Sequence, residues 1–438
     1  MSTTYYMLAA LIAAAGIPYI VWTRLDARKH RRAKAAHDDL LAMGDDMVPQ
    51  SLHPEIDLDA CIGSGSCERA CPEGEIIQIT DGRARLVNPL SCIGHSACMQ
   101  ACPVGAIKLV FGSVTRGVEL PMLTPEFETS QPGIYIIGEL TGMGLIRNAA
   151  MQGRQVGETI ARSGRRAGAG DADVIVVGAG PAGIAAALGC MAHGLSVRIL
   201  EQSVFGGTIA HYPRKKIVMT GTLELPGFGT IRKRTMQKED LLAVWREIRE
   251  RTNLDVSEGI RVESIRRDGD RWQVIGSDGV AGRSASVVLA LGRRGAPRQL
   301  GVPGEELHKV AYRLLEPEPF AGKHVMIVGG GNAAADCAIA LADSGLPQSV
   351  SLSYRRRELL RLRESVQTRL KQLIDDRAIT PYLASAVVSI APEHVTLSHP
   401  DGLIEIANDN VIVQIGGTSP SALLRTIGIE LVEKRGEA

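Results

Sequence analysis

A run of apolar residues that leads directly into a glycine-rich turn constrains this chain more than any other feature. The stretch 173–201 reads DVIVVGAGPAGIAAALGCMAHGLSVRILE. Four β-branched residues, Val174 to Val177, precede the turn, an alanine-rich segment follows it, and a second apolar run ends at Glu201. β-Branched runs favour strands and alanine favours helices, so the stretch predicts a strand, a tight turn, a helix and a second strand. This order indicates an α/β fold with a parallel sheet.

The residues of the turn match those of a Rossmann dinucleotide site. Gly178 permits the tight turn, Gly180 lets the backbone approach a pyrophosphate, and Gly183 lets the helix pack on the strand. The helix N-terminus directs free N–H groups and a positive dipole end at the phosphates. Glu201 is placed to accept hydrogen bonds from a ribose. The predicted residues of this site are Gly178, Gly180, Pro181, Ala182, Gly183 and Glu201.

A second glycine turn follows the apolar run 324–328. The strand that comes after this turn ends in different residues from those of the first. Here the G-x-G-x-x-A variant replaces the first pattern, and no acid ends the next strand. That strand ends instead in Tyr354 and three arginines, which suit a 2′-phosphate that an acid would repel. A solvated basic helix start is the alternative. The predicted NADPH contacts are Gly329, Gly331, Asn332, Ala334, Arg355, Arg356 and Arg361.

Composition excludes some classes of protein. The chain has 438 residues, which suggests two to four domains, and its 49 basic and 48 acidic residues give no sign of a nucleic-acid partner. Eight cysteines are too few for a secreted disulfide scaffold. Six of them lie within 61–102, which indicates metal binding or redox chemistry in a reducing compartment.

These six cysteines form an internal repeat. The pattern C-x5-C-x3-C-P occurs first at 61–72 and again at 92–103. It resembles the bacterial two-cluster ferredoxin, whose runs read C-x2-C-x2-C-x3-C-P and whose last cysteine ligates the other run's cluster. The resemblance implies two crossed ligand sets, one of Cys61, Cys67 and Cys102 and the other of Cys92, Cys98 and Cys71.

The second cysteine of each run is absent, and Ser64 and His95 occupy those positions. Three interpretations stay open. Each cluster is a 4Fe-4S cluster with a serine or histidine ligand, or a three-iron cluster, or the domain has lost its metal. Imidazole is an established iron–sulfur ligand, whereas a serine hydroxyl must first lose a proton. The six retained cysteines and both prolines favour bound clusters, although His95 could also be an ordinary polar loop residue.

The segment 127–153 resembles the last flavin-binding segment of the thioredoxin reductase-like family, T-x-x-P-G-I-[FY]-A-x-G-D. The resemblance implies that Gly138 and Glu139 contact FAD, with Glu139 in place of the usual aspartate. In that family the segment lies near the C-terminus, whereas here it precedes the first glycine turn. The stretch 411–431 resembles the part that normally comes just before it. We therefore predict a circular permutation; an unrelated glycine-rich loop is the alternative.

Two more stretches resemble the same family. Residues 205–213 resemble the loop that passes the isoalloxazine ring, which implies contacts from Gly207 and Thr208. Residues 287–305 resemble the crossover into the nucleotide domain. The family's C-x-x-C is missing, so its disulfide chemistry is not carried over. Cys190 and Cys337 each lie in an alanine-rich segment and are expected to be small buried residues.

The N-terminus predicts a membrane anchor. Tyr5 to Trp22 is an uncharged run of about 18 residues, near the minimum for a bilayer span. Tyrosine and tryptophan flank it, and six basic residues follow within 24–34, which places the remainder in the cytoplasm by the positive-inside rule. A cleaved signal peptide is the alternative, but its basic residues would precede the apolar run.

Together these features predict two Rossmann-like α/β domains for FAD and NADPH, a small α+β ferredoxin-like domain and an N-terminal transmembrane helix. The predicted ranges are 1–24 (anchor), 25–54 (helical spacer), 55–112 (ferredoxin-like, 4Fe-4S), 113–162 (permuted FAD-binding segment), 163–170 (linker), 171–318 (FAD), 319–418 (NADPH) and 419–438 (return to the FAD domain).

The expected function is an NADPH-dependent flavin and iron–sulfur oxidoreductase of the inner membrane with its catalytic part in the cytoplasm. Electrons would pass from NADPH through FAD to iron–sulfur clusters and a one-electron acceptor, or in reverse. The expected partner is a membrane redox protein or a quinone. A disulfide or low-molecular-weight thiol reductase and a redox sensor are the alternatives. No catalytic side chain is predicted, and the oligomeric state stays open, a homodimer included.

Overall fold

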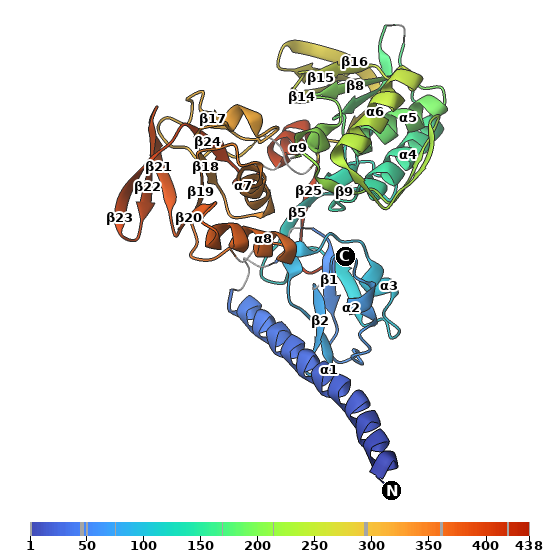
Figure 1. The fold of residues 1–438 in the computed structure, drawn as a ribbon. Coiled ribbons are helices and arrows are strands. Elements are labelled where there is room, and N and C mark those ends of the chain that lie inside the picture. The colour runs from blue at the N-terminus through green and yellow to red at the C-terminus, as the bar shows by residue number, and fades with distance from the viewer. Residues whose placement is uncertain are drawn as a thin grey trace. The chain divides into compact units, whose positions relative to one another are not determined.

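The computed structural model describes residues 2–43, 48–49, 51–74, 76–168, 170–212, 214–292, 297–359, 362–417 and 420–437. The side chains of residues 2–15, 39, 41–43, 219 and 364 lie outside this description. The chain forms two compact units, which are described separately. The first comprises residues 1–118 and 434–438, and the second comprises residues 119–433 (Figure 1).

The first unit is built around two antiparallel strand pairs. β1 (His53–Ile56) pairs with β4 (Ile107–Val110), and β2 (Ile77–Thr80) forms a hairpin with β3 (Arg83–Leu86). The unit has three short helices, α2 (Ser66–Ala70) and α3 (Ala97–Gln100) within the two cysteine runs and η2 (Pro89–Ser91) just before the second run. Its core contains aliphatic side chains of both pairs together with cysteines of both repeats.

A long helix, α1 (Ser2–Met43), precedes this domain. It is continuous across the predicted border between anchor and spacer, and β1 starts at His53, so the spacer ends earlier than expected. The small residue Ala33 is buried against the domain. Nδ1 of His30 donates to the carbonyl of Ile79 at 2.7 Å, and Nδ1 of His37 to that of Leu86 at 2.8 Å. The second half of α1 therefore packs on the β2–β3 hairpin.

The apolar run of α1 is only partly described. Tyr5 to Trp22 falls largely on residues whose side chains lie outside the description. In the part of the chain that is described, no helix meets the length and hydropathy needed to cross a bilayer. The described end of the run is nevertheless exposed: Ile17, Tyr19 and Trp22 are 62%, 65% and 60% accessible.

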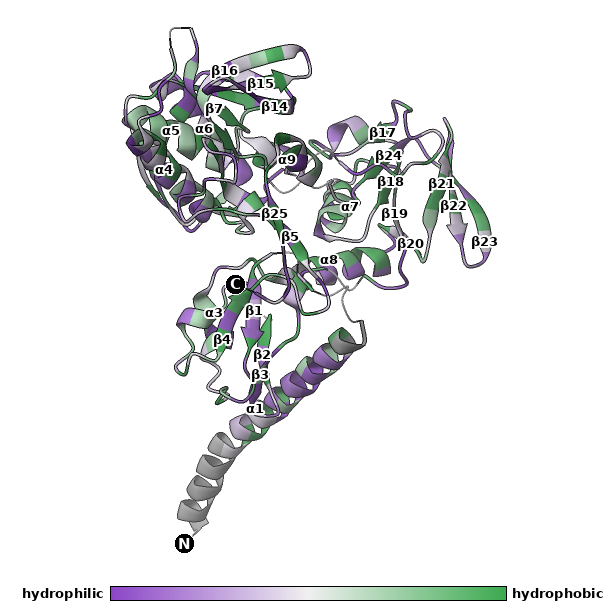
Figure 2. Cartoon of the chain, turned by 180° about the vertical axis from the view of Figure 1, so that it is seen from behind, coloured by the Kyte–Doolittle hydropathy of each residue, from purple (hydrophilic) through white to green (hydrophobic). Residues whose placement is uncertain are grey.

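The second unit contains a seven-stranded sheet. Its order is β13 (Val256–Glu258), β8 (Val197–Glu201), β7 (Ala172–Val177), β16 (Gly279–Leu289), β15 (Arg271–Gly276) and β14 (Val262–Asp268), with β6 (Ile134–Ile136) also paired to β16. The central strands are almost wholly apolar because both faces are covered, as parallel sheets require. Helices α4 (Ile146–Ser163), α5 (Pro181–Ala192) and α6 (Lys238–Thr252) pack beside this sheet (Figure 2).

Segments from both ends of the second unit meet beside this sheet. β6 runs parallel to β16 with Ile134 opposite Val287, although it precedes β7 in the sequence. A Cβ atom on Gly157 of α4 would lie 2.5 Å from the backbone of α5, so these two helices are in close contact. From the other end, α9 (Ser421–Ile427) buries Leu424 and Ile427 in the core that contains β6.

The nucleotide-binding part of the second unit is a five-stranded parallel sheet. Its order is β17 (Val310–Ala311), β24 (Asn410–Val413), β18 (His324–Val328), β19 (Ser349–Tyr354) and β20 (Thr380–Leu383). Helices α7 (Asn332–Ser344) and α8 (Glu364–Asp375) pack beside this sheet. β21 (Ala386–Ile390), β22 (His394–His399) and β23 (Gly402–Ala407) form a separate antiparallel sheet. Because β17 joins this sheet, the nucleotide-binding part starts before residue 319.

Short elements complete the two units. β9 (Ile217–Met219) pairs with β12 (Thr235–Gln237), β10 (Thr222–Leu225) with β11 (Gly229–Arg232), and β5 (Val118–Pro121) with β25 (Leu431–Lys434). The 3-10 turns are η3 (Gly138–Thr141), η4 (Gly207–His211) and η5 (Glu318–Phe320). After β25, Glu437 bridges to Phe111 of the first unit, so the chain does not remain in the FAD-type domain up to residue 438, as had been expected.

Asp173 fixes the junction between α4 and β7. Its carboxylate accepts hydrogen bonds from the N–H groups of Ala167 (2.7 Å) and Ser196 (2.9 Å) and pairs with Arg166. Burial alone would raise the pKa of Asp173, but the hydrogen bonds from Ser196, Ala167 and Arg166 outweigh it and lower this pKa. Asp173 thereby holds Arg166 and Ala167 of the predicted linker in place.

We expect Asp173→Asn to lower the free energy of unfolding by about 2 kcal/mol at pH 7, because a charged acceptor of several hydrogen bonds is lost. A carboxyl whose folded pKa is depressed stabilises the fold above its unfolded pKa, near 4, and loses that effect as pH falls through the folded value. Denaturant unfolding between pH 7 and 3 should therefore be less pH-dependent in the variant. An unchanged slope would contradict this role, and exposed Asp270→Asn is the control.

Candidate redox sites

The first glycine turn has the geometry that a dinucleotide requires. Gly178 has φ +109°, and a Cβ atom there would lie 2.4 Å from the carbonyl oxygen of Ala290. A Cβ on Gly183 would lie 1.8 Å from the carbonyl oxygen of Gly178, so only glycine lets α5 approach the turn. A Cβ on Gly180 would meet nothing within 4 Å. The backbone is thus open where the phosphates of a dinucleotide would approach, just before Pro181 and Ala182.

Glu201 is buried at the end of β8 and supports the turn. Its Oε2 accepts the N–H of Ala179 at 2.8 Å, and its Oε1 accepts the N–H of Ser203 at 2.9 Å. Each carboxylate oxygen can accept a second hydrogen bond. The predicted ribose contact is therefore compatible with these bonds and stays a prediction.

The two other predicted flavin segments lie against the same turn. A Cβ on Gly207 would lie 3.0 Å from the Cα of Gly180, which places η4 and the adjacent Thr208 beside it. A Cβ on Gly138 would lie 2.9 Å from the Cβ of Ala182. The N–H of Gly138 donates to the buried Gln152 at 2.7 Å, and the neighbouring Glu139 is exposed in η3. Three segments distant in sequence thus converge at the start of α5.

His211, at the end of η4, was not predicted as a site residue. Its Nε2 lies 3.0 Å from the hydroxyl of Ser203. Burial, with Arg313 and Lys238 nearby, lowers the pKa of His211 to about 4, so its ring is neutral at pH 7. Its Nδ1 is buried and has no hydrogen-bond partner among the described residues. An orphaned buried nitrogen beside the converging segments fits a site that a bound group completes.

The second glycine turn is constrained in the same way. Gly329 has φ +148°, and a Cβ there would lie 2.4 Å from the carbonyl oxygen of Gln414. Gly331 precedes α7, whose first residue, Asn332, accepts the N–H of Arg363 at 2.8 Å, and Ala334 is fully buried.

The predicted arginines follow the next strand. The ring of Tyr354, the last residue of β19, lies against Gly330, where a Cβ would be 2.1 Å away. Arg355 and Arg356 therefore leave β19 directly beside the glycine turn, where a 2′-phosphate would lie. Arg361 lies outside the described residues.

Ion pairs connect the segment after η4 to the nucleotide-binding part, and the sequence patterns did not indicate them. Nζ of Lys216 lies 2.5 Å from Oδ2 of Asp336, near the start of α7. Arg214 pairs with Glu316 at 3.3 Å and with Glu318 at 3.0 Å. These contacts lie within the second unit and connect the segment after a predicted flavin loop to the segment around η5 and to α7, the helix that follows the second glycine turn.

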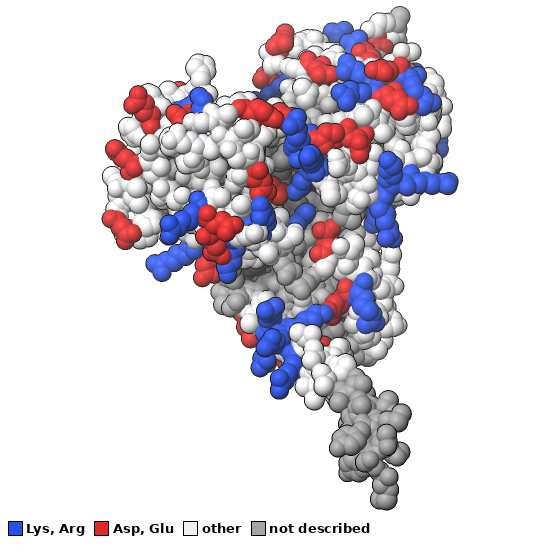
Figure 3. Space-filling model, viewed as in Figure 1, with Lys and Arg blue, Asp and Glu red and all other residues white. Residues whose placement is uncertain are grey.

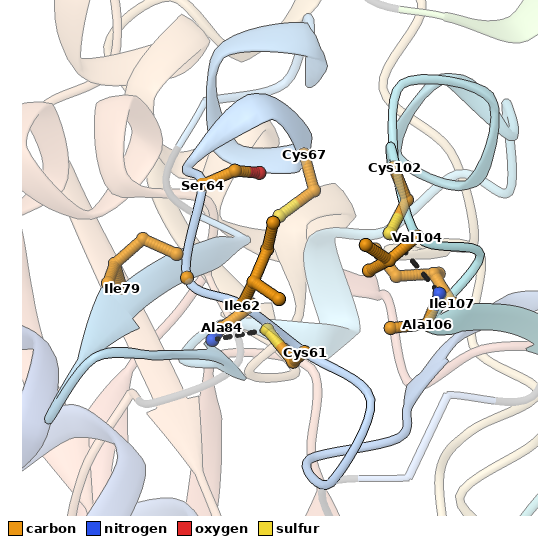
Figure 4. Close-up of a pocket in the computed structure, with 11 residues that line it drawn as sticks. Cys61, Ile62, Ser64, Cys67, Ile79, Ala84, Cys102, Val104, Ala106 and Ile107 are labelled. Atoms are coloured by element: carbon orange, nitrogen blue, oxygen red, sulfur yellow. Dashed lines mark hydrogen bonds between the residues drawn. The ribbon is translucent and has the colours of Figure 1, made fainter.

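In the first unit, Cys61, Cys67 and Cys102 line one cavity (Figure 4). Sγ of Cys61 accepts the N–H of Ala84 at 3.4 Å, and Sγ of Cys102 accepts that of Ala106 at 3.3 Å. Hydrogen bonds from N–H groups to cluster sulfurs tune the reduction potential of a bound iron–sulfur cluster. The other lining residues are Ile62, Gly63, Ser64, Ile79, Ala84, Val104, Ala106 and Ile107.

The other three cysteines form the second set. Burial raises the pKa of Cys98 to about 11, and the charges of Cys92 and Cys71 add to this shift. The pKa of Cys67 is raised by burial, with Cys61 and Cys102 adding to it. Electrostatic neighbours thus fall into the two crossed sets that the ferredoxin resemblance implied. In the described residues, no three His, Cys, Asp or Glu side chains form a site for a single metal ion.

The two replaced positions differ in exposure. Ser64 is exposed, whereas His95 is partly buried, with its Nδ1 accepting a long hydrogen bond of 3.4 Å from the N–H of Ala97. The cavity and the N–H···S bonds fit a cluster held by three cysteines. Cys190 and Cys337 are buried in α5 and α7 of the second unit, and burial raises the pKa of each thiol.

Two families match the chain. Residues 175–437 match the family described as pyridine nucleotide-disulphide oxidoreductase, and residues 53–103 match a 4Fe-4S dicluster domain. The first match covers more than half of the chain and begins inside β7, so β6 and α4 lie outside it.

Curated relatives of the chain include ferredoxin–NADP reductases. A ferredoxin–NADP reductase from Limosilactobacillus fermentum is 30% identical over 60% of this chain and 79% of its own length. One from Ignicoccus hospitalis is 32% identical over 42% of this chain, which spans only 56% of that relative. The solved bacillithiol disulfide reductase Bdr from Bacillus cereus has a TM-score of 0.52 at 25% identity, over 59% of this chain and 82% of its own.

These findings establish FAD, NADPH and iron–sulfur clusters as the cofactors. The glycine turns and the crossed cysteine sets described above fit these groups. The chain is an FAD-dependent oxidoreductase that belongs to the pyridine nucleotide-disulphide oxidoreductase family and is fused to a 4Fe-4S dicluster domain.

Proposed function

We propose that the protein passes electrons from NADPH through FAD to its iron–sulfur clusters and on to a one-electron acceptor at a membrane, or in the reverse direction. The observation that carries this proposal is the presence in one chain of two dinucleotide turns and two cysteine sets. NADPH supplies a hydride, FAD takes two electrons and releases them singly, and the clusters carry single electrons.

The chain's own residues bind and orient these groups. The turns at Gly178 and Gly329 leave bare backbone where phosphates approach, and α5 and α7 direct their N-termini there. Arg355 and Arg356 favour NADPH over NADH because they can pair with a 2′-phosphate. Hydride transfer needs no protein acid or base, so positioning is the contribution expected of the protein.

We infer a circular permutation of the flavoprotein part. The pairing of β6 with β16 and the packing of α4 on α5 support it, since the family match begins only at residue 175. A direct contact joins the two ends of this part: Nε2 of Gln131 donates to the carbonyl of Gly428 at 2.8 Å. In an unpermuted order, the segment that starts near residue 122 would continue from residue 431.

We further propose that α1 anchors the protein at the inner membrane with the redox domains in the cytoplasm. The exposed apolar residues Ile17 to Trp22 support this proposal, as do the basic side chains that follow them on α1 (Figure 3). The partner would then be a membrane redox protein or a quinone. Fractionation of cells that express the full chain and a variant lacking residues 2–22 tests the anchor.

Low-temperature EPR tests the electron route. We expect a reduced-cluster signal after one addition of NADPH to anaerobically purified protein. A Cys61→Ala/Cys92→Ala variant is the control, because its flavin should still bleach while the cluster signals are absent. The route would be contradicted if NADPH bleached the flavin while intact clusters gave no reduced signal.

A disulfide or low-molecular-weight thiol reductase is the second candidate, favoured by the similarity to the bacillithiol disulfide reductase Bdr. This candidate would be supported if the protein oxidised NADPH with disulfide substrates and if the Cys61→Ala variant did so at the same rate. A redox sensor is the third candidate. A flavin that NADPH cannot reduce would support it.

A further inference from the structure

The two cluster sites differ at the position that lacks a cysteine. Ser64 lines the cavity of Cys61, Cys67 and Cys102, and Figure 4 shows its hydroxyl directed toward the Cys67 side. Ser64 is exposed to solvent, whereas His95 is partly buried and its Nε2 has almost no accessible surface. The first site therefore has a solvent-exposed serine where a cysteine is missing, and the second set has a partly buried histidine at the matching position.

The Ser64 hydroxyl is held within its own turn. It donates to the hydroxyl of Ser66 at 3.3 Å and accepts the N–H of Ser66 at 3.4 Å. The preceding Gly63 has φ +68° and lies so close to Gly82 that a Cβ would be 2.2 Å from its carbonyl oxygen. This contact restrains the turn. Because an alcohol must also lose a proton to bind iron, Ser64 is a poor resident ligand.

A cation lies over the same turn. Nη2 of the exposed Arg69 donates to the carbonyl of Ser64 at 3.2 Å and to the hydroxyl of Ser66 at 3.4 Å. Its guanidinium can pair with an anion at the position of the missing cysteine. Two apolar side chains complete the rim of the cavity: Ile62 and Val104 are 61% and 45% exposed.

We propose that the cluster held by Cys61, Cys67 and Cys102 takes its fourth ligand from solution, and that this ligand is a small thiolate. Sulfur suits iron in such clusters, Arg69 pairs with the anionic head, and Ile62 and Val104 contact a short aliphatic tail. The thiol releases its proton to water and its sulfur donates a lone pair to iron; no electron is transferred. The site functions in this way whichever direction electrons flow through the protein.

EPR of the full chain, reconstituted anaerobically with ferrous iron and sulfide and reduced with dithionite, tests the proposal. We expect titration with 2-mercaptoethanol to shift the signal of one of the two clusters. Ser64→Cys supplies the missing cysteine, so its signal should not respond to the thiol. Arg69→Gln should weaken the apparent affinity about threefold, the effect of an exposed ion pair. Arg32→Gln, an exposed arginine of α1 in the same unit, is the matched control.

Several outcomes would overturn the proposal. These are a response of both clusters or of neither, a response that persists in Ser64→Cys, or a three-iron signal that remains in the presence of iron and thiol. The readout is the cluster spectrum alone, so it is independent of NADPH turnover and of the proposed electron route. A protein whose clusters NADPH cannot reduce would still show the shift.

Discussion

Cys71→Ala and Cys92→Ala should lose the same iron–sulfur cluster, although the two cysteines belong to different repeats. Cys61→Ala and Cys102→Ala should both lose the other one. The lining of the Ser64 cavity by Cys61, Cys67 and Cys102, and the electrostatic coupling of Cys98 to Cys92 and Cys71, are the physical reasons. Removing one thiolate from a site that has only three leaves too few ligands to hold a cluster.

EPR of the four reduced variants provides the measurement. Each variant should keep about half of the cluster iron, because one of two clusters remains. The spectra should coincide in the pairs Cys71/Cys92 and Cys61/Cys102. Cys190→Ala, which alters a buried thiol of α5, should keep both signals. If instead the spectrum of Cys61→Ala coincided with that of Cys71→Ala, each repeat would hold its own cluster. FAD content reports whether the second unit is still folded.

The grouping of Cys61 and Cys67 with Cys102 around one cavity could be predicted because each cysteine run is local in sequence and the family resemblance relates the two runs. Cys71 and Cys102 each precede a proline that ends a short run, and a family resemblance then assigns the partner site. The strand–turn–helix around Gly178 is similar, because steric demands within a few residues select glycine there. In both cases the chemistry is encoded by neighbours along the chain.

Other features could not be predicted because they depend on packing between distant segments. His30 and His37 read as part of a basic spacer, yet both bond to backbone carbonyls of the β2–β3 hairpin. His211 belonged to a predicted loop, but its burial beside Arg313 depends on a segment about 100 residues further on. No local pattern indicates which charges will face each other after folding.

Lys216 and Asp336 illustrate the same point and carry the largest expected effect on hydride transfer. Lys216 follows η4, which lies against the Gly180 turn, and Asp336 lies near the start of α7, which follows the glycine turn expected to bind NADPH. Both side chains are mostly buried, with 29% and 22% of their surface exposed. The pair therefore links the loop expected beside the flavin to the helix expected beside the nicotinamide dinucleotide.

Lys216→Glu should slow the reduction of FAD at saturating NADPH by about tenfold or more, because small displacements of a hydride donor from its acceptor are costly. Two carboxylates would face each other, and at a separation of about 4 Å near a protein surface they repel by about 4 kcal/mol. NADPH affinity should change little, since the glycine turn and the arginines that are predicted to bind the nucleotide are untouched. Stopped-flow flavin bleaching, measured against NADPH concentration, separates the two effects.

The charge-exchanged variant Lys216→Glu/Asp336→Lys should recover most of the lost rate, because attraction is restored between the same positions. Lys215→Glu is the matched control, because the Lys215 side chain is exposed and the residue contacts Glu239 through its backbone N–H, which the substitution keeps. If Lys216→Glu reduces FAD as fast as Lys215→Glu does, the pair does not set the distance between nicotinamide and flavin. If the exchange fails to recover the rate while FAD and NADPH still bind, Lys216 acts through something other than Asp336. Recovery would show that this ion pair, which joins the flavin loop to the nucleotide-binding part, is what positions the two rings for transfer.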